Sequence, residues 1–137
     1  MMLLHEGKNI DQAVAEFDAV MRGTVIRLPF PPSVNEMYLN NKGKGKGRIP
    51  APILIAWRSD AGWVLKAQKP KKITARCEIR IDLDERRQGD CANREKAVVD
   101  LLVAHGVIQG DQNRFVKRVN IGWEPVNECL VTITEAK

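Results

Sequence analysis

Residues 89–111 read GDCANREKAVVDLLVAHGVIQGD, and this stretch decides how the rest of the chain is interpreted. It opens on one acid, Asp90, and closes on another, Asp111. Between them, the spacing of apolar residues predicts a helix over residues 93–105, which Gly106 ends. If the chain turns back across the sheet on which this helix packs, the two acids converge.

The polar side of this helix carries a third group of interest. Asn93, Lys96 and Asp100 stand at i, i+3 and i+7, so they share one stripe. Two carboxylates and a lysine in a basic chain suggest metal-assisted chemistry on a phosphate. Each group also has an ordinary alternative, because such aspartates serve as a helix cap and a turn residue, and such lysines are usually solvated.

The composition limits the class of protein. A length of 137 residues suits one domain, and 22 Lys and Arg against 17 Asp and Glu give a net charge of +5. This charge favours a polyanionic partner, although a merely basic soluble protein fits it as well. Three cysteines without a CxxC pattern argue against a disulfide scaffold or zinc ribbon, and two histidines exclude a His-rich metal site. The N-terminus lacks a basic region and a long apolar run, so we expect no signal peptide, no membrane span and a cytoplasmic protein.

The periodicity predicts an α+β fold, with a small mixed sheet of about four strands packed with two helices, plus an N-terminal helical extension. The extension covers residues 1–23, and the domain covers residues 24–137. Strands are expected over residues 24–30, 73–83, 116–123 and 129–135, and the second helix over residues 53–69. The strand over residues 73–83 should bury its odd-numbered side and expose the other, and residues 125–127 should join the last two strands as a hairpin.

Residues 33–50 are polar and rich in glycine, and they predict a flexible basic loop. Its basic residues alternate with glycines and are Lys42, Lys44, Lys46 and Arg48. Mobile lysines neutralise phosphates without fixed geometry, so the loop is a candidate contact for a nucleic-acid backbone. A solvated loop without such a role is the alternative. The GxxxxGK[ST] spacing of a P-loop is absent.

Three further polar residues are candidates for DNA contact. Arg86 and Arg87 come shortly before Asp90, where they would clamp a phosphate or merely solvate a turn. Asn35 precedes the basic loop, where it would touch a backbone or a base, or cap the loop.

Three motifs in order resemble the RusA family of Holliday junction resolvases. They are LPFPPSVNEMY at residues 28–38, GDCANREKAVVDLL at residues 89–102 after the basic loop, and HGVIQGD at residues 105–111. The resemblance covers about residues 24–135. It implies a small mixed α/β fold and a magnesium-dependent homodimer that binds four-way DNA junctions and cuts two opposed strands.

The resemblance also assigns roles to residues. Asp90 matches the first acid of the D-x-D-N-x-x-K-A motif, Lys96 matches its lysine, and Asp111 matches the later acid. It implies that all three are catalytic and that Asp90 and Asp111 bind Mg²⁺. Asn93 would lend a carbonyl oxygen to the same ion.

The chain departs from the family pattern at the second motif acid, where it has Ala92. We therefore carry two functions forward. The first is a structure-selective DNA endonuclease that resolves four-way junctions with Mg²⁺ in recombination and repair. The second is a junction-binding protein that cuts weakly or not at all. An unrelated basic α/β protein is a third possibility. Separately, Asp100 is expected to contact Lys96 along the helix face.

Overall fold

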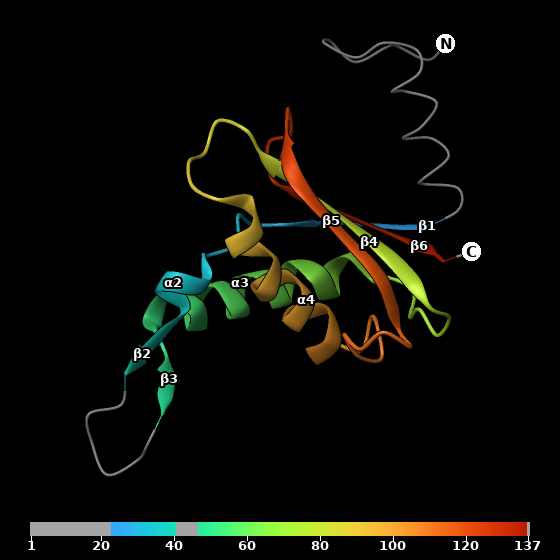
Figure 1. Cartoon of the computed structure of the whole chain (residues 1–137), viewed down its shortest axis with the longest axis horizontal. Coiled ribbons are helices and arrows are strands. Elements are labelled where there is room, and N and C mark those ends of the chain that lie inside the picture. The colour runs from blue at the N-terminus through green and yellow to red at the C-terminus, as the bar shows by residue number, and fades with distance from the viewer. Residues whose placement is uncertain (1–22, 41–46, 137) are drawn as a thin grey trace.

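The computed structural model describes residues 23–40 and 47–136 (Figure 1). The elements in chain order are β1 (Gly23–Leu28), α2 (Val34–Met37), β2 (Tyr38–Asn40), β3 (Arg48–Pro50), α3 (Pro52–Gln68), β4 (Cys77–Asp84), the 3₁₀ helix η1 (Cys91–Arg94), α4 (Glu95–Ala104), β5 (Val116–Glu124) and β6 (Cys129–Glu135). The predicted helical extension lies outside the described residues, apart from Gly23, which opens β1.

The main sheet has four strands in the order β1-β6-β4-β5. β4 and β5 are parallel, whereas β6 runs antiparallel to both of its neighbours, β1 and β4. A parallel pair requires a crossover, and η1 with α4 supplies it. The prediction of an α+β fold with a small mixed sheet is confirmed.

α3 and α4 pack on one face of the main sheet (Figure 1). Every second residue of β4 from Cys77 to Leu83 is buried beneath them, as the strand pattern predicted. Gly62, within α3, lets the two helices approach, because a Cβ there would lie 3.1 Å from Nε2 of His105 at the end of α4. A glycine inside a helix costs about 1 kcal/mol relative to alanine, and here it provides the space for that contact.

Two side chains of α3 form hydrogen bonds to the edge strand β1 and to the residue that follows it. The indole Nε1 of Trp57 donates to the Pro29 carbonyl at 3.0 Å. The Gln68 side chain accepts from the Arg27 N–H at 2.8 Å and donates to the Arg27 carbonyl at 2.7 Å, as a neighbouring strand would. β1 is an edge strand, and Gln68 occupies part of its free edge.

The predicted hairpin between the last two strands is wrong. β5 and β6 lie on opposite sides of β4, and residues 125–128 cross over the end of that strand. Two strand spacings are about 10 Å, which four extended residues can span at about 3.3 Å each. A connection of this length is therefore compatible with a hairpin and with a crossing. The crossover through α4 places β5 on one side of β4, and β6 pairs with the other side.

The predicted wet face of β4 is also wrong at its C-terminal end. Asp82 and Asp84 are buried, at 8% and 7% exposure, although Asp82 belongs to the side of the strand expected to be exposed and Asp84 lies just beyond the predicted strand. β4 is a central strand, so neighbouring side chains cover it from both sides. Each carboxylate is paired with an arginine, Arg80 or Arg86, as buried charges require. The strand also begins at Cys77 rather than at residue 73, because Ile73 forms only an isolated bridge to Ile108.

Residues 33–50 contain structure that their composition did not predict. α2 begins after Ser33, whose N–H donates to Oε1 of Glu36 at 3.0 Å. β2 and β3 then form a second, two-stranded sheet that projects from the rest of the domain (Figure 1). Lys42, Lys44 and Lys46 lie between these strands in the sequence and outside the described residues. Within the described part of the chain, no helix is long and apolar enough to cross a membrane.

Candidate functional site

α4 presents its polar stripe outward because its apolar face is buried. Ala97, Val98, Leu101 and Leu102 pack into the core, and Lys96 and Asp100 lie on the more exposed side. The predicted helix over residues 93–105 is thus divided, with η1 forming its first turn and α4 the rest. Asp90 is the N-cap residue of η1, yet its side chain makes no capping hydrogen bond. The interpretation of Asp90 as a helix cap is therefore not supported.

The chain returns beside α4 after Gly106. The Val107 N–H donates to the Leu102 carbonyl at 2.9 Å, and the Ile73 N–H donates to the Val107 carbonyl at 2.7 Å. Val107 and Ile108 are buried, so the following loop is anchored to the core before β5 begins. This anchored return brings Asp111 back toward the first turns of α4.

A pocket of about 320 Å³ lies between α4, the loop that carries Asp111, and the start of β5. Its lining residues are Ala92, Glu95, Lys96, Val99, Asp100, Asp111, Val116 and Val119. Lys96 and Asp111 therefore line the same pocket, and position 92 forms part of the same wall. The sequence analysis had expected Asp90 to converge with Asp111. Asp90 and Asn93 are described residues that are not among those that line the pocket.

Lys96 is held by an ion pair along the helix. Its Nζ lies 3.2 Å from Oδ2 of Asp100, which confirms the predicted contact. The hydrogen bond and charge of Asp100 raise the pKa of Lys96, and the charge of Asp111 contributes in the same direction. The ammonium group therefore stays protonated at neutral pH and faces carboxylates on two sides of the pocket.

Glu95 is a pocket residue that the sequence interpretation missed. It precedes Lys96 and is half-buried in the pocket wall. The spacing of Ala92, Glu95 and Val99 follows one helix face at i, i+3 and i+7, and this spacing was the available signal. Glu95 does not belong to the polar stripe of Asn93, Lys96 and Asp100 on which the sequence analysis relied.

The pocket offers oxygen ligands without a complete metal cage. Among the described residues, no three His, Cys, Asp or Glu side chains are placed so that together they hold a metal ion. Mg²⁺ needs fewer protein ligands than this, because it commonly binds through one or two carboxylates, substrate phosphate and water. Asp111 and Glu95 fit that description, since Asp100 is already paired with Lys96.

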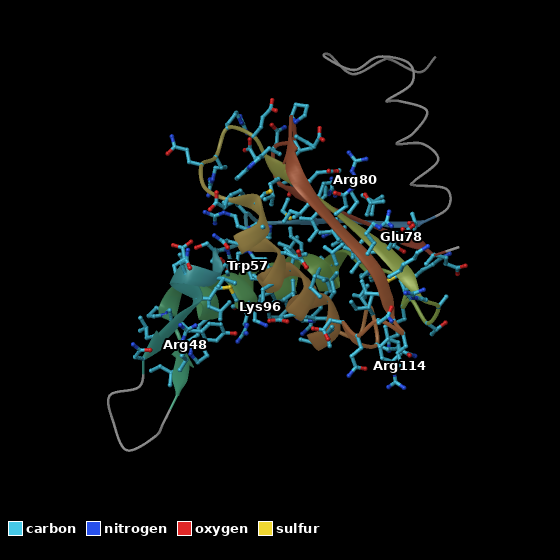
Figure 2. All side chains as sticks on the ribbon, viewed as in Figure 1. Arg48, Trp57, Glu78, Arg80, Lys96 and Arg114 are labelled. Carbon is cyan, nitrogen blue, oxygen red and sulfur yellow. The ribbon has the colours of Figure 1, made fainter. Side chains whose placement is uncertain are left out.

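The candidate DNA-binding residues lie in different environments. Arg86 makes a two-point contact with Asp84, with Nε–Oδ1 at 2.9 Å and Nη2–Oδ2 at 2.8 Å. The guanidinium of Arg87 lies 4.2 Å from the centroid of the Phe30 ring. Asn35 and Arg48 are exposed, Arg48 on the projecting hairpin (Figure 2). The three loop lysines are outside the described residues.

The segment of residues 37–59 concentrates positive charge. It contains five basic residues and no acid, and its basic residues are Lys42, Lys44, Lys46, Arg48 and Arg58. The same part of the chain, with the rest of α3, holds the exposed large apolar side chains of the described residues, which are Leu39, Ile49, Ile53, Ile55, Trp63 and Val64. Of these basic residues, Arg48 and Arg58 belong to the described part of the chain, and both are exposed.

Neither a protein-family model nor a curated protein sequence matches the chain.

The Asp84–Arg86 pair predicts a pH dependence. The side-chain hydrogen bond from Arg86, then its backbone N–H, lowers the pKa of Asp84 to about 2. The unfolded value is about 3.9, so the ionised carboxylate stabilises the fold above about pH 4, and this contribution is lost as the pH falls toward 2. In Arg86→Met, the pKa of Asp84 should rise toward its ordinary range, as measured by carboxyl-carbon NMR. Arg87→Met is the control and should shift it less, and an unchanged Asp84 titration in Arg86→Met would contradict the pairing.

Proposed function

We propose that the chain is a magnesium-dependent DNA endonuclease of the RusA type that resolves four-way junctions. The observation that carries this proposal is the pocket that holds Lys96, Asp111 and position 92 together. These are three of the four positions of the family pattern that bear charge, and they come from two segments of the chain. Their convergence supports the motif match as a spatial site.

In the proposed reaction, the pocket residues have different roles. Lys96 lies beside the scissile phosphate and stabilises the charge that develops on its oxygens. Asp111 and Glu95 line the pocket and would hold Mg²⁺. Asp90 and Asn93 lie outside the pocket lining and are the further ligands that the motif match implies, Asn93 through a carbonyl oxygen. When bound, the ion neutralises phosphate charge and makes water a stronger nucleophile. Asp100 keeps Lys96 charged and turned along the pocket wall.

The cationic segment of residues 37–59 supports DNA as the partner. The three loop lysines, Arg48, Arg87 and Asn35 contact the phosphate backbone outside the pocket, and Arg86 contributes the donors that Asp84 leaves free. Because backbone contacts carry no sequence information, they suit a substrate that is recognised by shape. We also propose that the protein is cytoplasmic, because it must have access to such DNA.

A homodimer completes the proposal. Two opposed cuts require two sites related by a two-fold axis. The apolar side chains exposed along α3, with Trp63 at 73% exposure, support a contact between two copies.

The second candidate function is a junction-binding protein that does not cut. Ala92 favours it, because an apolar side chain lines the pocket at the position of a motif acid. The ion pair of Lys96 with Asp100 also permits this function, since both groups have a structural role without substrate.

The cleavage test compares a synthetic four-way junction with a linear duplex of the same sequence, each in Mg²⁺ and in EDTA. Paired cuts in the junction that require Mg²⁺ are expected. Asp90→Asn and Asp111→Asn should abolish the cuts while binding survives, because removing a carboxylate also removes repulsion of phosphate. Junction binding without cuts would favour the second function, and Ala92→Asp should then restore cutting. Equal affinity for junction and duplex would contradict both functions.

Lys96 has its own test. Lys96→Ala should lower the single-turnover rate by about 10²-fold or more, on the scale of other groups that stabilise developing charge. This change also leaves Asp100 unpaired in the pocket, so the double variant Lys96→Ala/Asp100→Asn is the control for added negative charge. If the double variant recovers the wild-type rate, Lys96 is only a partner of Asp100.

The loop lysines are tested by salt dependence. Replacing Lys42, Lys44 and Lys46 with alanine should weaken junction binding and reduce the slope of log K against log[salt] by about 0.9 for each lost phosphate contact. The control replaces Lys69, Lys71 and Lys72, which removes the same charge from the end of α3 and the residues after it. If both variants have the same slope, the loop makes no specific contact with DNA.

A further inference from the structure

Arg94 joins two segments that lie far apart in the sequence. Its Nη1 donates to the Pro31 carbonyl at 2.7 Å, and its Nη2 donates to the Gln88 carbonyl at 3.4 Å. Its guanidinium also lies 4.6 Å from the centroid of the Phe30 ring. The side chain is only 13% exposed, and Nη1 lies 3.7 Å from Oε1 of Glu36. One largely buried guanidinium therefore connects the proline-rich segment after β1 to the turn before η1.

The contact reaches the residue next to Asp90. Gly89 has a φ of +117°, and a Cβ at that position would lie 3.1 Å from Nη2 of Arg94. The absence of a side chain at Gly89 thus leaves room for the guanidinium. On the other side, the Asn93 N–H donates to the Asp90 carbonyl at 3.3 Å. The backbone on either side of Asp90 is therefore contacted by the Arg94 side chain and by the first hydrogen bond of η1.

The burial of Arg94 has a free-energy cost, which argues against a role in fold stability alone. Its Nε is buried and has no hydrogen-bond partner among the described residues. An unsatisfied buried donor destabilises a fold, and apolar side chains of similar volume often replace buried charged groups without loss of stability. The distinct property of arginine here is geometric, because its planar group donates to two carbonyls at once. Methionine fills similar space without those donors.

We propose that Arg94 is a positioning residue that holds the turn of residues 88–90 against Phe30 and Pro31 and so fixes Asp90 for Mg²⁺. This rests on the proposed function, which makes Asp90 a metal ligand. It also gives the proline-rich segment a role at the site, since Phe30 and Pro31 form the surface on which the turn is held. Without Arg94 the turn gains freedom, and the ordering of Asp90 must then come from the binding of the ion.

The first measurement is amide hydrogen exchange in the metal-free protein. Arg94→Met should increase exchange in residues 88–93, and Arg94→Lys should give a smaller increase because it retains the charge and a single donor group. Arg114→Met is the matched control, since Arg114 lies over the ring of Phe115 at the same 4.6 Å. It should leave exchange in residues 88–93 unchanged. Thermal melting establishes whether each variant is folded. If Arg94→Met does not fold, the exchange measured in Arg94→Lys tests the proposal instead.

The second measurement is the Mg²⁺ concentration that gives half-maximal junction cleavage. Loss of a residue that orients a metal ligand commonly lowers metal affinity by about 10- to 100-fold. The midpoint in Arg94→Met should rise on that scale, while the affinity for the junction in EDTA stays constant. A folded variant with unchanged exchange, or with an unchanged Mg²⁺ midpoint, overturns the positioning role while the proposed function stands. If the wild-type protein does not cut, the proposed function fails, and the exchange result alone decides whether Arg94 holds the turn.

Discussion

The parallel pairing of β4 with β5 is the constraint on which the rest of the structure depends. Two parallel neighbours cannot be joined by a tight turn, so the chain must cross one face of the sheet between them. α4 makes that crossing, and its apolar face joins the core with α3. The same geometry leaves the outer stripe of α4 beside the first residues of β5, Val116 and Val119, where the pocket lies.

The local elements were predictable because each has a strong period. The two long helices and the four strands of the main sheet were found within a few residues, since apolar residues recur at every second position in the strands and at every third to fourth position in the helices. The order of the strands was not, because a four-residue connection between β5 and β6 suits a neighbour or a strand one place further. The burial of Asp82 and Asp84 followed from that order and was missed with it.

The site was predicted in part, and for a clear reason. Lys96 and Asp111 converge because the chain folds back after Gly106, as a helix stop near an acid suggested. Glu95 and Arg94 were missed because neither belongs to the motif that drew attention to this stretch. Arg94 acts through contacts with residues about 60 positions earlier, and no local pattern reports such a contact. The short β2–β3 sheet was missed because glycine and lysine dominate its surroundings.

The charges of the chain are distributed unevenly between the pocket and the hairpin. Around the pocket, three carboxylates face one ammonium group, for a formal charge of −2. The segment of residues 37–59 carries five positive charges without an acid. Under the proposed function, a phosphate backbone is attracted to this basic segment and repelled by the pocket until a cation enters between the pocket and the phosphate. An acid at position 92 would increase that repulsion by one more charge. For a nuclease of the proposed kind, Ala92 would weaken the binding of a metal ion but would also lower the electrostatic cost of bringing DNA to the pocket without one. The hydrogen-bonded, half-exposed pair of Lys96 and Asp100 does not oppose this approach, because a surface ion pair of this kind contributes about 1 kcal/mol or less, which a phosphate oxygen at Lys96 can replace.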